Sequence, residues 1–327
     1  MSGQAQAENR SFAARPWWRW LTRVLTLAFF LLVGYLLLNQ VRSVEWDEVV
    51  GAMRSRSSSE LWLALLLSAT SFALYSCFDL LGRHATGHRL PVPKVMMINF
   101  VSYAFNLNIG SIVGGVAFRY RLYSRFGLDA DVITRVVVMS MFTNWIGYVL
   151  LSGAVFARPP FALPDEWRLG VAGLQALGIA LLAVTASYVL LCTFARRRSW
   201  EFWGKELTLP SLPLALLQLC MSCVNWLLIA AILFVLLRQQ IAFPVVLGTL
   251  LVAAIAGVLA HIPAGLGVLE TVFVALLSDR HPKSDLLAAL LTYRAVYYLL
   301  PLAMAALIYL IVELRAKKDG RRMTKQT

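Results

Sequence analysis

The sequence predicts an all-α, polytopic integral membrane protein with about six full spans plus two oppositely oriented re-entrant helical hairpins. Hydrophobic residues make up 59% of the 327 residues and charged residues only 14%, against about 45–50% and about 25% in soluble domains. The apolar residues also cluster into charge-free blocks of about 18 residues or more, the length that a helix needs to cross a bilayer. A net charge of +13 is then interpreted as the basic loops of a membrane protein rather than as a nucleic-acid signal.

Six blocks are typical of simple spans: 24–41, 61–78, 136–157, 169–195, 214–237 and 286–312. The first follows a basic N-terminal segment, residues 1–19, and no small-residue cleavage site follows it. We therefore expect an uncleaved span rather than a signal peptide. A single transmembrane domain would cover residues 20–313, followed by a basic tail at residues 314–327, and an amphipathic stretch near Trp46 predicts a short interfacial helix.

Two further blocks, about 95–118 and about 245–278, do not resemble simple spans. Their centres carry polar and helix-breaking residues: Asn106, Asn108, Gly114 and Gly115 in the first, and Pro263, Gly265 and Gly267 in the second. Such residues interrupt helices, and the freed backbone groups must then be satisfied within the protein. Both blocks are expected to form hairpins that enter and leave on one side. The alternative is that they are ordinary spans, because Gly and Pro are frequent in membrane helices.

The distribution of basic residues favours the hairpins. With the N-terminus inside, the hairpin topology places 21 Lys and Arg residues in the cytoplasm and 8 outside, whereas eight full spans would give 16 and 13. The positive-inside rule prefers the first arrangement, which puts both termini in the cytoplasm. The hairpins then have opposite orientations, as in the inverted repeats of transporters, whose broken helices meet near the bilayer midplane and hold the substrate.

Three charged residues lie in or beside apolar blocks, where an ionised group costs about 2.5–3.5 kcal/mol on insertion scales. Asp79 is expected to be structural, either reaching the interface or pairing with Arg83. Glu270 and Arg294 are expected to bind substrate or to pair with each other. An internal ion pair that only joins two helices is the alternative for these two residues.

Arg119 directly follows the first hairpin and its glycine pair. A glycine pair allows close approach of a ligand or helix, and a guanidinium there can grip phosphate through two parallel bonds. The alternative, which has equal weight for Arg121, is a topology signal. Asn144-Trp145 and Asn225-Trp226 repeat a polar dipeptide in two apolar runs, which suggests a polar path or a weak trace of duplication.

Other motifs predict little chemistry. The sequence contains no dinucleotide fingerprint, phosphate-binding loop, nucleophile elbow or zinc-protease motif. Cys220 and Cys223 lie in an apolar run and are interpreted as packing residues. Glu270 with His261 is the one pair near in sequence that an intramembrane enzyme could use, and it lacks the further groups that catalysis needs. We therefore expect no enzyme, no catalytic residue, no metal and no cofactor. Nucleic acid is not expected as a partner.

Three segments resemble the lysylphosphatidylglycerol synthase transmembrane-domain (flippase-domain) family, and within it the YbhN-like inner membrane proteins. They are YAFNLNIGSIVGGVAFRYRLYSRFGL, HIPAGLGVLE and LLTYRAVYYLLP, and the resemblance extends from about Trp20 to Ala316. It implies a membrane part that moves an aminoacylated phospholipid between leaflets, beside a separate soluble domain that makes the lipid. Only a short basic tail follows Val312, so a synthase activity is not expected.

The expected function is that of a lipid translocase of the bacterial inner membrane that handles an anionic phospholipid or a related lipid. The expected substrate-binding residues are Arg119, Arg294, Glu270, Asn106, Asn108, Gly114, Gly115, Pro263, Gly265 and Gly267. Broken helix ends would add backbone N–H groups for an anionic headgroup. The alternative is an accessory protein that recruits or regulates a lipid-synthesising or lipid-modifying enzyme. The sequence does not predict the oligomeric state.

Overall fold

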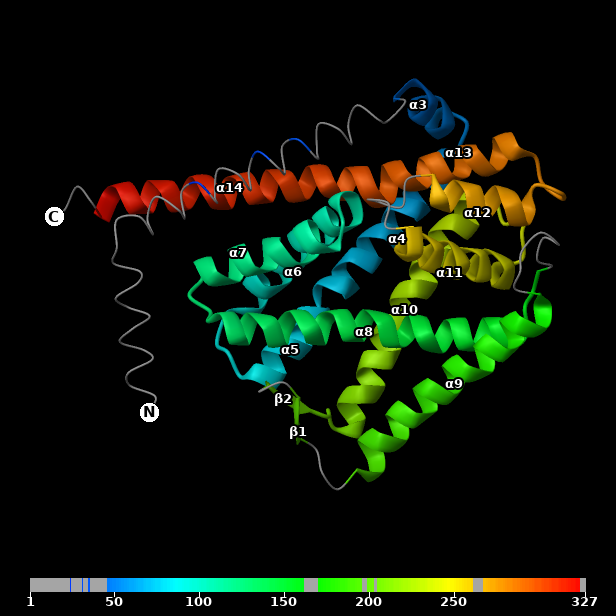
Figure 1. Ribbon diagram of the computed structural model, residues 1–327. Coiled ribbons are helices and arrows are strands. Elements are labelled where there is room, and N and C mark those ends of the chain that lie inside the picture. The colour runs from blue at the N-terminus through cyan, green and yellow to red at the C-terminus, as the bar shows by residue number, and fades with distance from the viewer. Residues whose placement is uncertain are drawn as a thin grey trace. The chain divides into compact units, whose positions relative to one another are not determined.

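The computed structural model describes residues 46–161, 170–195, 199–202, 205–260 and 267–323, together with the single positions 24, 31 and 35. The regular secondary structure in these ranges is helical except for one short antiparallel hairpin of strands between α9 and α10, as Figure 1 shows. The elements are α3 (Trp46–Arg54), α4 (Ser58–Ser76), α5 (Phe78–Thr86), α6 (Val92–Ile109), η1 (Ser111–Ala117), α7 (Phe118–Arg125), α8 (Ala130–Ala157), α9 (Val171–Phe194), β1 (Ser199–Phe202), β2 (Lys205–Thr208), α10 (Leu212–Leu236), α11 (Phe243–Ala260), α12 (Val268–Leu277), α13 (Lys283–Tyr293), η3 (Arg294–Leu299) and α14 (Leu300–Met323).

Six helical segments within the described residues are long and apolar enough to cross a membrane: Ser58–Thr86, Ala130–Ala157, Val171–Phe194, Leu212–Leu236, Phe243–Ala260 and Lys283–Arg315. The fold class, an all-α polytopic membrane protein, is therefore confirmed. The predicted first span and the basic segment 1–19 lie outside the described residues. The predicted tail at 314–327 continues the last helix as far as Met323, and the predicted interfacial helix corresponds to α3.

Local chemistry explains several of the helix ends. A capping box opens α4, in which the Ser57 side chain accepts from the Glu60 backbone and the Glu60 side chain accepts from the Ser57 backbone. Gly87 closes α5 in the left-handed region, with φ of +67°. Pro213 lies in the first turn of α10, where its missing N–H removes no helical bond.

The first predicted hairpin is present as two helical arms that pack against each other, α6 and the η1–α7 segment. The chain reverses at Gly110, whose φ of +95° and ψ of +166° are accessible almost only to glycine. The returning arm begins as the π-helical segment η1 and continues without a break into α7. In the second predicted hairpin, α11 and α12 also pack together, and the residues 261–266 between them are not described.

Two contacts between helix ends agree with the predicted hairpin topology rather than with eight full spans. Arg125 of the first returning arm forms an ion pair with Glu313 near the end of the last apolar helix, and Arg238 after α10 approaches Glu60 at the start of α4 to 3.6 Å. If each block were one full span, both pairs would join residues on opposite sides of the membrane. The number of crossings, the membrane re-entry and the cytoplasmic position of the termini remain predictions.

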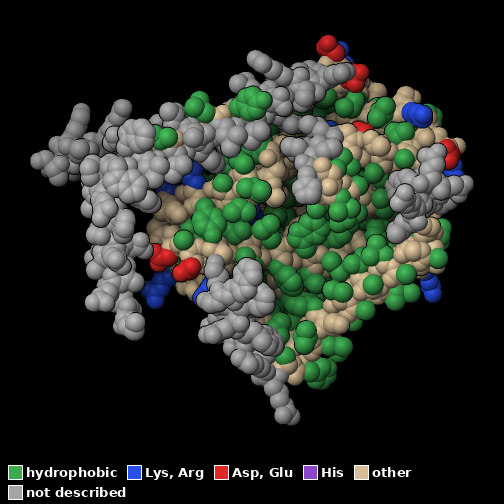
Figure 2. Space-filling view, in the orientation of Figure 1, with side chains coloured by type: hydrophobic (Ala, Val, Ile, Leu, Met, Phe, Trp, Pro, Cys, Tyr) green, Lys and Arg blue, Asp and Glu red, His purple; other side chains and the backbone are tan. Residues whose placement is uncertain are grey.

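Packing divides the helices into an inner group and a periphery. The helices α4, α6, α8 and α10 contact several neighbours, whereas α9 packs mainly on α8, as Figure 1 shows. On the face drawn in Figure 2, hydrophobic side chains cover much of the described surface. Such a large exposed apolar surface is expected where lipid replaces water.

Candidate functional site: an aromatic cavity beside two buried ion pairs

A cavity of about 860 Å³ lies where the two hairpins meet. Its wall includes Asn106–Gly115, from the turn of the first hairpin, except for Asn108 and Gly114. Val258 and Leu269, from the two arms of the second hairpin, contribute on the other side, and α8, α10 and η3 complete the wall. The volume lies within the range of about 300–1,000 Å³ that is common for ligand pockets.

The cavity wall is mainly aromatic and apolar. Seven described lining residues carry aromatic rings: Tyr75, Tyr103, Trp145, Trp226, Tyr293, Tyr297 and Tyr298. Tyr75 and Tyr103 stack with their ring centroids 3.5 Å apart, and Tyr103 and Tyr297 share a hydrogen bond of 3.0 Å between their hydroxyls. The Tyr297 hydroxyl also lies 2.9 Å from Ser71 Oγ, which donates to Asn225 Oδ1 at 2.7 Å. These contacts fix the rings and join α4, α6, α10 and η3 behind the wall.

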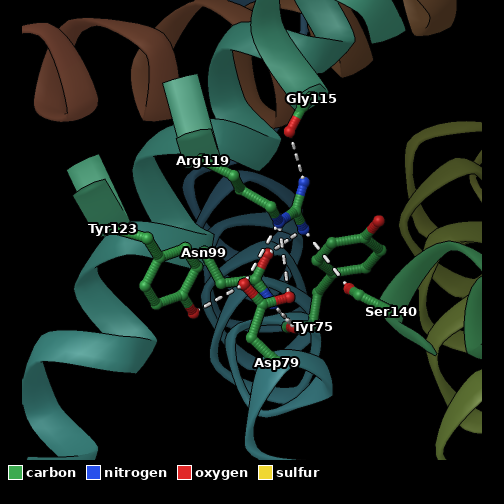
Figure 3. Close-up of polar contacts among 7 residues, drawn as sticks. All are labelled: Tyr75, Asp79, Asn99, Gly115, Arg119, Tyr123 and Ser140. Carbon is green, nitrogen blue, oxygen red and sulfur yellow. Dashed lines mark hydrogen bonds and ion pairs between the residues drawn. The ribbon is translucent and has the colours of Figure 1, made fainter. Parts of the chain in front are cut away.

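Arg119, one of the residues that line this cavity, belongs to a buried ion pair, and Figure 3 shows the polar contacts of that pair. Arg119 is 3% exposed and Asp79 is fully buried, and Arg119 Nε donates to the two carboxylate oxygens of Asp79 at 3.3 and 3.1 Å. The other nitrogens of the guanidinium donate to the Gly115 carbonyl at 2.8 Å, to Ser140 Oγ at 3.3 Å and to Asn99 Oδ1. One guanidinium therefore connects α5, α6, η1 and α8 to its own helix, α7.

The geometry of this pair differs from the expected pairing of Asp79 with Arg83. The pair also engages the guanidinium that was expected to bind phosphate. Asp79 pairs with Arg119, 40 positions away, and not with Arg83, whose Nε donates to the Leu90 carbonyl at 2.8 Å. Tyr123 adds a hydroxyl that donates to Asp79 Oδ2 at 2.9 Å. Arg119 does line the cavity, but its donors are already directed at protein acceptors. An anionic ligand would have to displace Asp79 to gain a two-pronged grip on this guanidinium.

The second ion pair joins Glu270 of α12 to Arg294 at the start of η3. Arg294 Nη2 donates to Glu270 Oε2 at 2.9 Å, and Arg294 Nε donates to Glu270 Oε1, which makes the pair bidentate. The guanidinium also lies over the Tyr298 ring, 5.5 Å from its centroid. The mutual pairing that the sequence left open is thus present. Neither residue is among the described cavity-lining residues, although their neighbours Leu269 and Tyr293 are.

The remaining predicted residues take different places. Asn106 and Gly115 line the cavity. Gly114 lies so close to α6 that an added Cβ would stand 2.3 Å from the Asn106 nitrogen. Asn108 is buried behind the wall, and its amide donates to the Ala104 carbonyl at 2.8 Å and to the Tyr298 carbonyl at 3.2 Å. Of the Pro and Gly residues predicted for the site in the second hairpin, Gly267 is the one that the structure describes.

In that second hairpin, Gly267 precedes α12 with φ of +78°, a left-handed conformation that favours glycine. Pro263 and Gly265 lie outside the described residues. No group of three or more His, Cys, Asp or Glu side chains suited to a metal ion occurs in the described part of the chain. The described lining of the candidate site comes from the first hairpin, α4, α8, α10, α11, α12, α13 and η3.

The repeated Asn-Trp dipeptides meet at the cavity. Ser222 Oγ and Trp226 Nε1 donate to the Asn144 carbonyl at 2.8 and 3.3 Å, which locks α10 against α8. Gly147 permits this approach, because an added Cβ would lie 2.3 Å from Ser222 Oγ. Asn144, Trp145 and Trp226 line the cavity, so both copies of the dipeptide contribute to the same wall.

The tyrosines of the wall were not predicted as site residues. Tyr293, Tyr297 and Tyr298 occur within six residues of the last apolar block, and positions four apart share one face of a helix. This spacing of tyrosines around Arg294 was the signal in the sequence that could have identified them as site residues. Tyr75 and Tyr103 carry no comparable pattern in the sequence.

Comparison with known proteins agrees with this architecture. The family described as lysylphosphatidylglycerol synthase TM region matches residues 23–305. The chain belongs to this family. It is 45% identical over 306 residues to the inner membrane protein YbhN of Escherichia coli, which covers 93% of this chain and 96% of that protein. Together with the six apolar helices, this similarity supports a multi-pass protein of the inner membrane.

Two other family relatives differ in how much of their length is matched. The uncharacterized protein slr0712 of Synechocystis is 30% identical over 289 residues, which cover 87% of this chain and 89% of that protein. The phosphatidylglycerol lysyltransferase of Staphylococcus haemolyticus is 23% identical over 295 residues, which cover 87% of this chain but 33% of that protein. The shared region is therefore the membrane part of a longer enzyme in that relative.

Proposed function

We propose that this protein is a lipid translocase of the inner membrane that takes the headgroup of an anionic phospholipid or a related lipid into the cavity while the acyl chains stay in the bilayer. The observation that carries the proposal is the cavity itself, about 860 Å³ in volume and placed where two broken helical hairpins meet. Translocation of this kind moves a lipid without making or breaking a covalent bond, so we propose a transporter rather than an enzyme.

The side chains at the edge of the cavity suit a lateral entrance. Ile112 is 80% exposed, Val258 48% and Met141 37%, and all three belong to the cavity lining. In a membrane, apolar groups exposed at a cavity edge face acyl chains at little cost. A lipid can therefore keep its tails beside these residues while its headgroup reaches the polar and aromatic wall.

The hairpin turn offers a place for the phosphate of such a lipid. The residues after Gly110 open η1, and Ser111, Ile112 and Val113 all line the cavity. The first N–H groups of a helical segment have no partner within it and carry partial positive charge. This supports an anionic lipid even though Arg119 and Arg294 are paired with carboxylates.

Reconstitution into liposomes tests the proposal. The purified protein is expected to accelerate the movement of a labelled phospholipid between leaflets relative to empty liposomes. Ala254→Trp, which fills the cavity wall, should abolish the acceleration, whereas Ala183→Trp, on the exposed face of α9, should not. If the folded wild-type protein matches empty liposomes across a panel of lipids, the translocase proposal is wrong.

The alternative is an accessory role beside a lipid-modifying enzyme. It is favoured by the match to only 33% of the phosphatidylglycerol lysyltransferase of Staphylococcus haemolyticus, in which the same membrane region is joined to further sequence. A stable enzyme partner that co-purifies in native membranes, combined with no lipid movement by the purified protein, would favour this role.

A further inference from the structure

The part of the cavity wall that the structure describes carries little net charge. Among the described lining residues, Arg119 is the charged one, and the buried carboxylate of Asp79 neutralises it. A charged ligand group that enters a site without an opposite charge loses its hydration and gains no ion pair in return. The described wall therefore favours a ligand group that is polar but uncharged.

Two half-buried amide side chains and one half-buried indole N–H of the wall are available to a ligand. Asn106, Asn144 and Trp145 are half-buried and line the cavity. No side-chain hydrogen bond of these residues is formed with the part of the chain that the structure describes, although the Asn144 carbonyl accepts from Ser222 and Trp226. An amide offers a donor and an acceptor at once, and the indole N–H offers a second kind of donor.

A hydroxyl group matches this set better than an ion does. A hydroxyl also donates and accepts, so it can use both ends of an asparagine amide, whereas an ammonium only donates and a carboxylate or phosphate only accepts. Trp226 and Tyr298 belong to the same wall, and aromatic rings can pack against the C–H groups of a sugar or glycerol. Ammonium is the competing ligand, since the same rings can attract a cation.

We propose that the cavity recognises an uncharged polyhydroxyl headgroup, a glycerol or sugar unit, through Asn106, Asn144 and the indole N–H of Trp145. The inference rests on the proposed lipid-handling function and adds the chemical class of the headgroup. Phosphatidylglycerol and glycosyl diacylglycerols both carry this chemistry, but only the first also carries a phosphate. The hydroxylated unit occupies the aromatic wall.

Competitive binding measured by native mass spectrometry tests the inference. The protein is presented with equimolar phosphatidylglycerol, diglucosyl diacylglycerol, phosphatidylethanolamine and phosphatidylserine, all with the same acyl chains. The two hydroxylated lipids are expected to be retained over the other two. Asn144→Leu should reduce their retention about fivefold, the effect of about one hydrogen bond. The control Gln175→Leu, which also replaces an amide by leucine but on the exposed face of α9, should not.

The possible outcomes separate this inference from the proposed function. Equal retention of all four lipids, preference for phosphatidylethanolamine, or unchanged retention by Asn144→Leu overturns the headgroup assignment while lipid movement in liposomes continues. Retention of phosphatidylglycerol without the glycolipid also overturns it, because phosphate would then be the recognised group. Trp145→Phe, which keeps a ring but removes the N–H, checks folding and recognition together: it should keep the thermal stability and weaken the preference for hydroxylated lipids.

Discussion

Replacing Arg119 by Met is expected to destabilise the protein strongly, because the change leaves the Asp79 carboxylate buried without a cationic partner. Asp79 is fully buried, and the Tyr123 hydroxyl at 2.9 Å would be its remaining side-chain donor. Removal of one partner from a buried ion pair costs about 3–5 kcal/mol. The same change also leaves the Gly115 carbonyl and Asn99 Oδ1 without the donors that they have now.

Removing both charges should cost less than removing either one. In Asp79→Leu combined with Arg119→Met, no ionised group remains buried, so we expect a coupling energy of at least about 2 kcal/mol between the two positions. Unfolding in mixed detergent and SDS micelles, followed by circular dichroism, measures the four free energies. Arg238→Met is the matched control, because its pair with Glu60 spans 3.6 Å and Arg238 is 48% exposed, a setting worth about 0–1 kcal/mol.

The same variants separate a structural role from ligand binding. If the pair only joins helices, the double variant should move lipid in liposomes nearly as well as the wild type, since the ligand never uses the guanidinium. If Arg119→Met costs no more than Arg238→Met, or if the two single effects add, the argument for a coupled buried pair is wrong. A stable double variant without lipid binding would instead place Arg119 among the ligand contacts.

Other positions give sharper single tests. Gly114→Ala should lower the thermal midpoint by several degrees, because the new Cβ would meet the Phe105 carbonyl carbon at 2.3 Å, and overpacking costs about 1–3 kcal/mol; an unchanged midpoint contradicts the close approach. Glu270→Gln should destabilise more than Arg294→Met combined with Glu270→Gln, as denaturant titration can show; equal losses would mean that the two side chains are not coupled. Burial lowers the pKa of His88, so its contribution to stability should be complete above about pH 6.5 and decline as the pH falls below that value; a His88→Gln variant should lack this decline in unfolding titrations.

The sequence predicted the fold class and the break in the helix at the end of α6 because both depend on local properties. Charge-free blocks mark apolar helices, and the Asn and Gly residues before η1 mark the point at which α6 ends. The turn at Gly110 needs a residue that tolerates φ of +95°, and the sequence provides glycine there. These signals lie within a few residues of the structure that they specify.

The partners of charged residues could not be predicted in the same way. Arg83 lies one helical turn from Asp79, and residues at that spacing can pair, so the local pair was the expected one. The structure instead brings Arg119 to Asp79 across the first hairpin, and Arg83 turns to the Leu90 carbonyl. The choice depends on how α5, α6 and α7 pack, which no short segment of sequence specifies.

The two ion pairs suggest a division of roles within the hairpins. Each returning arm carries one member of a pair, Arg119 in α7 and Glu270 in α12, and each pair joins that arm to a different neighbouring element. A buried pair resists displacement, because separating it exposes two unpaired charges to an apolar setting. The cavity edge, by contrast, is formed by exposed apolar residues such as Ile112 and Val258, which repack among acyl chains at little cost. Any movement that admits a lipid should therefore occur at the turn of the first hairpin and leave both ion pairs closed. In a variant whose four native cysteines are replaced, a spin label on Ile112→Cys should then change mobility on lipid binding, while a label on a cysteine introduced beside Arg119 should not.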